Sequence, residues 1–260
     1  MKLAIIGGSL LKQLSGLTDT GAETASETID TPFGMPSGEI VSGYIDGLEV
    51  VFINRHGPEH HIPPHLVNYR ANMFVLKMLE VTHIVAVMAV GGITQKMAPM
   101  SWVLPDQIID YTYGREHTYN DGSDVVHHID FTYPYDAVLR QVLARALQDC
   151  GHKYISEATY GATQGPRLET AAEILKMERD GCDIVGMTAM PEASLARELE
   201  MPYANLALVV NWAAGKNGDL SDGDNAEQGL VSIEEIRRMV DDGNVMLQSI
   251  IQQLAGLLRV

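Results

Sequence analysis

The sequence of 260 residues predicts an α/β fold, in which helices surround a central β-sheet. Short continuous apolar runs, such as residues 3–6 and 83–90, are followed by glycine pairs, and this pattern is typical of buried strands. Segments with helical spacing of apolar residues alternate with these runs. Because no internal repeat, linker or low-complexity segment divides the chain, residues 1–260 are expected to form one domain.

The elements follow in chain order. The expected strands are residues 3–6, 39–44, 50–54, 83–90, 102–104, 107–109, 156–163, 184–187 and 203–210. Asp46-Gly47 joins the second and third of these as a hairpin. The expected helices are residues 65–79, 135–147, 169–180, 191–199 and 233–258. Pro63-Pro64 opens the first helix and Ser232 caps the last. Two polar segments, residues 110–134 and 215–229, are expected to be loops.

The composition limits the function. A formal net charge of -16 repels nucleic acid and anionic membrane surfaces, so neither is an expected partner. The apolar run at the N-terminus is too short for a signal peptide, and no stretch is long enough to span a bilayer. Cys150 and Cys182 are too few for a disulfide framework, which fits a reducing cytoplasm.

Two turns that follow expected strands carry groups that suit an anion. Residues 7–9, Gly-Gly-Ser, offer backbone N–H groups and a hydroxyl, although such a turn can also simply end a strand. Residues 55–57, Arg-His-Gly, add a guanidinium fork and an imidazole. His60 and His61 follow closely, so a surface loop or a metal site are alternatives. A metal is not expected, because no matching cysteine and no His-Glu-x-x-His pattern accompanies them.

Three further polar residues stand at strand ends. Glu169 either complements the dipole of the next helix or faces a cleft at the edge of the sheet. Thr188 can cap a helix or help to hold an anion. Asn211 is placed just after the strand at residues 203–210, where Asn is common in turns. Its amide can also pair with a purine edge that offers both a donor and an acceptor.

Taken together, these segments resemble the family of trimeric purine nucleoside phosphorylases and methylthioadenosine phosphorylases. The likeness extends over nearly the whole chain: residues 5–9, 30–34, 55–57, 64, 67–72, 91–92, 165–167, 187–188 and 191–192. Within the family, the bacterial S-methyl-5'-thioinosine phosphorylase branch is the most similar, through residues 114–119 and 128–131. The resemblance implies a central mixed, partly barrel-like sheet flanked by helices, and a homotrimer with sites shared between subunits.

The resemblance also implies roles for individual residues. Four side chains and one backbone N–H would bind phosphate: Ser9, Arg55, His56, Thr188 and the N–H of Ala89. Two catalytic residues, Glu169 and Asn211, would contact the base. Met187 would pack against the ribose, with Glu192 near it. The 5' substituent would be surrounded by His60, Ile233 and Ile236, with His128 entering from a neighbouring subunit.

The residues expected at the base favour a 6-oxopurine. Relatives specific for adenine carry Asp-x-Asp where this chain has residues 211–213, Asn-Trp-Ala, and a Ser in place of Glu169. Hypoxanthine N1 carries a proton that a carboxylate can accept. Adenine N1 would leave two unpaired acceptors facing each other, at a cost of about 1–3 kcal/mol. Asn211 can donate to O6, and Ala213 removes the second acid.

Three features depart from the pattern of the family. Ser9-Leu10 replaces the usual Thr-Gly, so the turn keeps its hydroxyl but loses a glycine. Met88 stands where relatives have Thr or Asn, and a thioether is a poor hydrogen-bond partner. The loop at residues 215–229 is longer and more acidic than the family pattern.

The reaction that the resemblance implies is phosphate-dependent cleavage of the N-glycosidic bond of a purine nucleoside. The expected substrate is S-methyl-5'-thioinosine, which would give hypoxanthine and 5-methylthioribose 1-phosphate. Inorganic phosphate is a co-substrate, and no metal or organic cofactor is expected. Alternatives are a methylthioadenosine phosphorylase, a broad purine nucleoside phosphorylase, a hydrolytic nucleosidase and a non-catalytic binding protein. The anion-binding residues argue against the last two.

Overall fold

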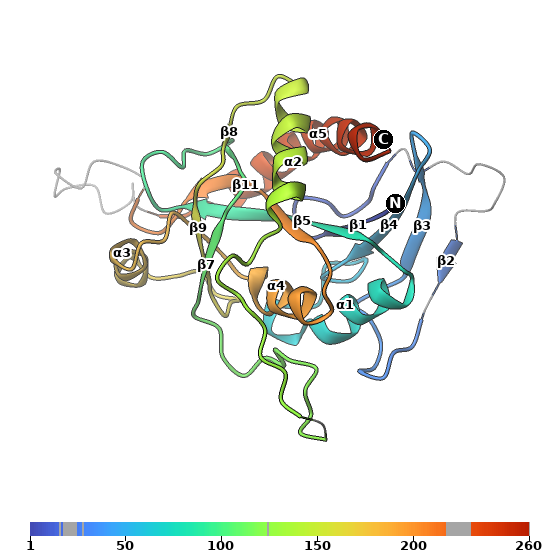
Figure 1. Cartoon of the computed structure of the whole chain (residues 1–260). Helices are drawn as coiled ribbons and strands as arrows, with labels where there is room; N and C mark the ends of the chain where they lie inside the picture. The colour runs from blue at the N-terminus through green and yellow to red at the C-terminus, as the bar shows by residue number, and fades with distance from the viewer. Residues whose placement is uncertain (16, 18–24, 28, 124, 217–229, 260) are drawn as a thin grey trace, which may run out of the picture.

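The computed structural model describes residues 1–15, 17, 25–27, 29–123, 125–216 and 230–259 (Figure 1). Its strands are β1 (Lys2–Gly7), β2 (Ala25–Glu27), β3 (Ile40–Ile45), β4 (Leu48–Asn54), β5 (His83–Gly92), β6 (Trp102–Val103), β7 (Gln107–Asp110), β8 (Tyr154–Ile155), β9 (Thr159–Ala162), β10 (Ile184–Gly186) and β11 (Tyr203–Trp212). Its α-helices are α1 (Tyr69–Met78), α2 (Ala137–Asp149), α3 (Ala171–Arg179), α4 (Ala189–Glu198) and α5 (Ile233–Leu258), and a 3-10 turn, η1, covers Pro64–Leu66.

All of these strands belong to one mixed sheet. Its order is β2-β3-β4-β1-β5-β10-β9-β7, and a branch of β11, β6 and β8 joins it at β5. β1 runs parallel to β4 and β5, whereas β10 runs antiparallel to β5. Helices α2 and α5 lie on one side of the sheet, α1 and α4 on the other, and α3 at one end (Figure 1). The expected α/β fold with a mixed sheet flanked by helices is confirmed.

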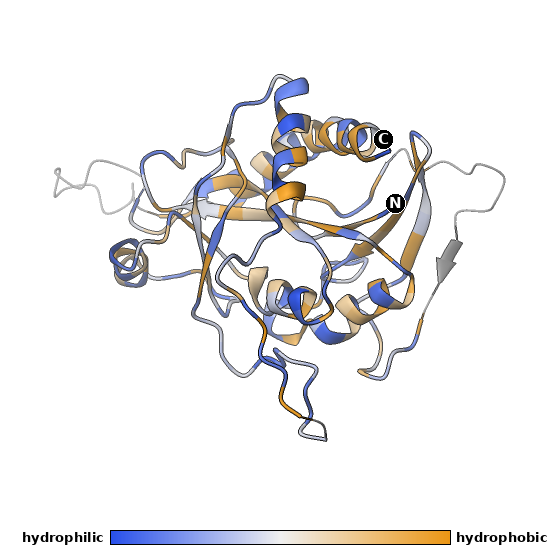
Figure 2. Ribbon diagram, in the orientation of Figure 1, coloured by the Kyte–Doolittle hydropathy of each residue, from blue (hydrophilic) through white to orange (hydrophobic). Residues whose placement is uncertain are grey.

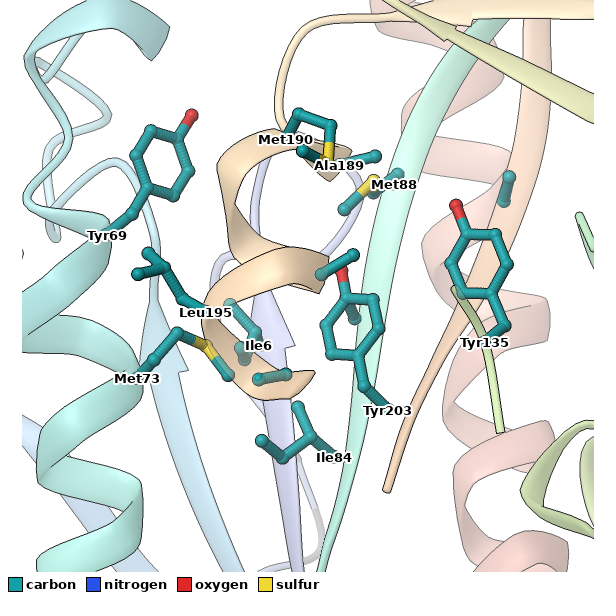
Figure 3. Packing of buried hydrophobic residues seen from close by; sticks show 14 of the residues in the cluster. Ile6, Tyr69, Met73, Ile84, Met88, Tyr135, Ala189, Met190, Leu195 and Tyr203 are labelled. Atoms are coloured by element: carbon teal, nitrogen blue, oxygen red, sulfur yellow. The ribbon is translucent and has the colours of Figure 1, made fainter. Parts of the chain in front are cut away.

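The central strands are apolar along their length because both faces of the sheet are covered. One core lies towards α1 and α4 and includes Ile6, Ile84 and Leu195 (Figure 3). The other lies towards α2 and α5 and includes Ile5 and Val85. Successive residues of one strand therefore point into different cores, which explains the unbroken apolar runs. The helices show hydrophobic and hydrophilic sides that match this burial (Figure 2).

The first helix and some of the strands differ from the expectation. Helix α1 begins at Tyr69, because the Asn68 side chain accepts a hydrogen bond from the Ala71 N–H and so caps it there. The strand expected at residues 156–163 is shorter and corresponds to β9 alone, whereas β8 lies before that range and was not expected. Strand β2 was not expected. Of the expected loop at residues 215–229, residues 217–229 lie outside the described residues.

Strand β5 continues through the glycine pair that was expected to end it. Gly91 and Gly92 pair with β10 on one side and with β11 on the other. A Cβ on Gly92 would lie 1.9 Å from the Met97 backbone oxygen, so the pair serves close packing inside the sheet and does not end the strand.

The two edges of β5 are used differently, and this positions the site. Strand β11 pairs with β5 from Ile84 to Gly92, so it occupies one whole edge. The other edge is shared: β1 pairs with residues 83–86 and β10 with residues 91–92. Because β1 is parallel and β10 antiparallel to β5, the carboxyl ends of both point towards residues 87–90. In the described strands this stretch has no partner on that edge, and ligands favour such breaks in a sheet.

Substitutions at two glycines of α5 test how this helix packs on the sheet. Gly256 is open to solvent, and Gly256→Ala should raise the free energy of unfolding by about 0.5–1 kcal/mol through helix propensity. A Cβ on Gly243 would lie 2.1 Å from Leu208 Cδ2, so Gly243→Ala should lower that free energy by about 1–3 kcal/mol through overpacking. Urea unfolding of both variants measures the difference, and an equal gain in both would contradict the packing described.

Candidate active site

A cavity of about 420 Å³ opens at the break on the edge of β5. Its walls are the turn after β1, the turn after β10, the middle of β5, the end of β11 and the start of α5. Most of the site residues expected from the sequence line it: Ser9, Arg55, His56, His60, Ala89, Glu169, Met187, Thr188, Asn211, Ala213 and Ile236. Residues far apart in the sequence are therefore gathered around one space.

Arg55 is the cation of this cavity, and it is held by a carboxylate. Its Nε donates to Glu192 Oε2 at 2.7 Å and its Nη2 to Glu192 Oε1 at 2.8 Å. The Tyr203 hydroxyl donates to the same Oε1 at 2.9 Å. The two charged side chains are 1% and 0% exposed. Burial lowers the pKa of Arg55, but the Glu192 carboxylate outweighs it, so the pKa is raised and the guanidinium stays charged.

Glu192 thus lies behind the cavity wall and is not among the lining residues. Its bidentate contact fixes the plane of the Arg55 guanidinium and leaves Nη1 towards the turn after β1, where it also donates to the Gly7 carbonyl at 3.3 Å. A Cβ on Gly8 would lie 2.8 Å from this Nη1, so glycine is needed for the close approach. The expected position of Glu192 near a ribose stays a prediction.

His56 is a neutral imidazole in this environment. Burial, together with the Arg55 charge, lowers its pKa to about 4. Its Nδ1 lies 2.8 Å from the Ile62 carbonyl, which can only accept, so Nδ1 carries the proton. Nε2 is therefore an acceptor, suited to a hydroxyl of a protonated oxyanion. The ring centroids of His56 and His60 are 4.5 Å apart, and His60 Nε2 lies 3.3 Å from Ser9 Oγ.

Glu169 also lines the cavity. Helix α3 begins two residues after it, where Thr170 and Glu173 form a reciprocal capping box. The helix terminus therefore does not use Glu169. The carboxylate accepts a hydrogen bond from the Thr163 hydroxyl at 2.6 Å, and this fixes its orientation.

Asn211 lies inside β11 and not after its end, so the expected position is corrected. The register with β5 slips between Val209 and Asn211, and this bulge makes both Val210 and Asn211 line the cavity. Asn211 Nδ2 donates to the Trp212 carbonyl at 2.6 Å. An amide nitrogen carries two hydrogens, so its second N–H can donate to a ligand. Thr188 precedes α4 as its N-cap residue, yet its hydroxyl makes no capping bond.

Two other expected residues lie away from the cavity of their own chain. Ile233, the first residue of α5, is 52% exposed. His128 is exposed on the segment between β7 and α2, which projects from the side of α1 and α4 (Figure 1). The described part of this segment contains no helix or strand between residues 111 and 136, as expected for a long loop.

Some residues that line or support the cavity were not predicted as site residues, although Met88 was noted as a departure from the family pattern. Part of the cavity is formed by apolar side chains: Ile62, Pro64, Leu168 and Val231. Met88, also on the wall, lies beside Ala189 and Met190 at the start of α4 (Figure 3), and its Sδ accepts from the buried Asn205 Nδ2 at 2.9 Å. Tyr203, which holds Glu192, is part of an apolar strand run, and no sequence signal distinguishes it.

Among the described residues, no group of three or more His, Cys, Asp or Glu side chains could hold a metal ion. In that same part of the chain, the helices are too short or too polar to cross a membrane.

Comparisons with known proteins place the chain in one family. The family model of the phosphorylase superfamily matches residues 2–242. A probable S-methyl-5'-thioinosine phosphorylase of Pseudomonas syringae pv. tomato is 50% identical over 241 residues, which is 92% of either chain. A 6-oxopurine nucleoside phosphorylase of Pyrococcus furiosus is 46% identical over 84% of this chain and 82% of its own. The solved methylthioadenosine phosphorylase of Schistosoma mansoni with adenine has a TM-score of 0.87 at 30% identity, over 99% of this chain and 92% of its own.

The fold and the cavity thus define an α/β enzyme whose site combines the Arg55 guanidinium with the Glu169 carboxylate and the Asn211 amide. The chain belongs to the phosphorylase superfamily. The resemblance found in the sequence is confirmed, and so is the expected class of enzyme, a pentosyltransferase of the purine nucleoside phosphorylase type.

The buried ion pair has an exposed counterpart that serves as a control. Arg167 also makes two hydrogen bonds to one carboxylate, that of Glu173, through Nη1 at 2.8 Å and Nη2 at 2.7 Å, but these side chains are 68% and 44% exposed. Arg55→Gln should lower the free energy of unfolding by about 3–5 kcal/mol, because it leaves a buried carboxylate unpaired. Arg167→Gln should cost about 0–1 kcal/mol. Urea unfolding checks both, and equal small losses would refute the strength assigned to the buried pair.

The state of His56 makes stability depend on pH. Its folded pKa, about 4, lies below the unfolded value near 6.5, so the unfolded chain binds the proton more readily. The contribution is fully present above about pH 6.5 and is lost as the pH falls towards 4, with an upper limit of about 3 kcal/mol. Without phosphate, unfolding free energies between pH 7 and 4 should fall less steeply for His56→Gln than for the wild type. His61→Gln, at an exposed neighbour, should match the wild type; identical slopes for all three would contradict a neutral His56.

Proposed function

We propose that this chain catalyses phosphorolysis of 6-oxopurine nucleosides, with S-methyl-5'-thioinosine as its preferred substrate. One observation carries the choice of base. Glu169 and Asn211 line the same cavity, and Ala213 stands beside them where a second acid would favour adenine. A carboxylate that accepts from N1–H and an amide that donates to the purine suit hypoxanthine. The names of the relatives from Pseudomonas syringae and Pyrococcus furiosus support this proposal.

Phosphate would bind at the cationic end. Arg55, fixed by Glu192, would contact it with Nη1, and Ser9 and Thr188 would add hydroxyl groups. The unpaired stretch of β5 would offer the N–H of Ala89. Neutral His56 would accept a hydrogen bond from a protonated phosphate oxygen through Nε2. Phosphate in this place would stabilise the cationic sugar and then attack C1'.

The departing base would be stabilised at the opposite end. The Thr163 hydroxyl holds the Glu169 carboxylate, and the second N–H of Asn211 Nδ2 is available to the purine. As the glycosidic bond stretches, negative charge develops on the purine, and fixed donors at that position lower the barrier. The sugar would lie between the two ends, against Met187.

The 5' substituent would meet a mainly apolar wall. Ile236 and Val231 line the cavity beside His60, and an apolar methylthio group suits them better than a hydroxyl. The exposed position of His128 fits a contact with a neighbouring subunit, as in the expected homotrimer with shared sites. Ile233, also exposed, would belong to the same edge of the site.

The proposal also covers the domain, the location and the co-substrate of the protein. Residues 1–260 would act as one nucleoside phosphorylase domain in the cytoplasm, with phosphate as co-substrate and no cofactor. A second candidate activity, phosphorolysis of methylthioadenosine, is favoured by the likeness to the Schistosoma mansoni enzyme. The Glu169, Asn211 and Ala213 combination argues against it, because adenine N1 would face a carboxylate.

Base selectivity is testable with a double variant. The wild type should cleave methylthioinosine with a higher kcat/KM than methylthioadenosine or inosine, and only with phosphate present. Asn211→Asp with Ala213→Asp should shift the methylthioinosine to methylthioadenosine ratio towards adenine by about 5–150-fold, equivalent to 1–3 kcal/mol. The uncharged control, Asn211→Ala with Ala213→Ser, should weaken both activities without reversing the preference. Turnover that is independent of phosphate would instead establish a hydrolase.

A further inference from the structure

Arg115 is a buried cation whose hydrogen bonds all go to uncharged groups. It lies on the segment between β7 and α2 and is 8% exposed. Among the described residues, no carboxylate lies within ion-pair distance of it: the ion pairs of this part of the chain involve other cations. A buried guanidinium needs partners for its donors, and here uncharged oxygens supply them.

One set of bonds reaches the loop that carries Glu169. Arg115 Nη2 donates to the carbonyl oxygens of Thr163 and Gln164, at 3.2 and 2.8 Å. Its Nε donates to Gln164 Oε1 at 3.2 Å. Thr163 is the residue whose hydroxyl holds the Glu169 carboxylate at 2.6 Å. A single residue, Thr163, therefore connects the guanidinium to Glu169, which is proposed to contact the base.

A second set reaches the loop between β10 and α4 and the first turn of α4. Arg115 Nη1 donates to the carbonyl oxygens of Met187 and Met190, at 2.8 and 2.6 Å. The Tyr69 hydroxyl lies 3.3 Å from the same nitrogen, and Tyr69 and Met190 lie at the same end of α4 (Figure 3). These bonds bracket Thr188, which is proposed to contact phosphate.

The two loops also touch each other directly. A Cβ on Gly165 would lie 2.5 Å from Met187 Sδ, and Gly165 has a positive φ of 58°, so glycine is required at this contact. Apart from this packing, Arg115 joins the loops through a rigid, planar set of donors. A lysine could not reproduce it, because its three donors leave from a single nitrogen.

We propose that Arg115 is a positioning residue that fixes the base-contacting loop, with Glu169, against the loop that holds the sugar and phosphate. This inference rests on the proposed function. Base, C1' and phosphate must be aligned in phosphorolysis, and a displacement of about 1 Å can cost on the order of 100-fold in rate. Thr163 connects the guanidinium to Glu169. Weakening the hydrogen bonds of Arg115 should therefore reduce the selectivity for 6-oxopurines over 6-aminopurines.

The test compares selectivity, because a ratio of two activities does not depend on the folded fraction. Arg115→Lys keeps the charge and should lower the ratio of kcat/KM for methylthioinosine over methylthioadenosine by about tenfold. Arg140→Lys is the matched control: Arg140 of α2 also bridges two backbone carbonyls, those of Leu104 and Ser156, but neither of these residues lines the cavity, whereas Met187, a partner of Arg115, does. Its ratio should equal that of the wild type.

Two further measurements keep the proposal testable. Methylguanidinium added to Arg115→Ala should restore part of the selectivity, and an effect of general destabilisation would not be rescued in this way. Thr163→Val removes the hydroxyl that holds Glu169. The double variant with Arg115→Lys should lower the selectivity ratio by less than the product of the two single effects. A selective wild type with an unchanged ratio in Arg115→Lys overturns the positioning role. A wild type without selectivity overturns the proposed base preference instead.

Discussion

Strand β5 has two edges, and the way they are shared determines where chemistry can occur. One edge is closed by β11, whereas the other is divided between β1 and β10, which approach from opposite directions. Their ends leave residues 87–90 without a strand partner on that edge among the described strands. Backbone groups that need partners and two strand-to-loop turns therefore converge on one space. A cavity of about 420 Å³ follows from this topology.

Two buried guanidinium groups contact residues that line this cavity or support its wall, and they are held in different ways. Arg55 is fixed by the Glu192 carboxylate, so it is oriented without losing its charge. Arg115 is held by backbone carbonyls of two loops, so it connects chain segments. In a chain with a net charge of -16, Arg55 supplies the local positive charge that a phosphate would need, and Arg115 keeps the loops around the cavity in place.

Much of the fold could be predicted because it depends on local patterns. Continuous apolar runs identified β1, β5 and β11, since strands covered on both faces carry no alternation. Ser232, as a cap, identified the start of α5, and its hydroxyl does accept a bond from the Glu235 N–H. Errors arose where pairing or capping overrides the local signal. Gly91 and Gly92 belong to β5 because two strands pair with them, and α1 starts late because Asn68 caps it.

The sequence by itself determined which chemical groups this protein has at its strand ends: a guanidinium, imidazoles, hydroxyls, a carboxylate and an amide. Those identities follow from residue type and from order along the chain. Only the tertiary structure decided where each group is directed. A bulge directs Asn211 to the cavity, Thr163 orients Glu169, and Glu192 lies behind Arg55. The reason is physical: direction, burial and hydrogen-bond partners depend on contacts between segments far apart in sequence, and these exist only once the sheet has formed.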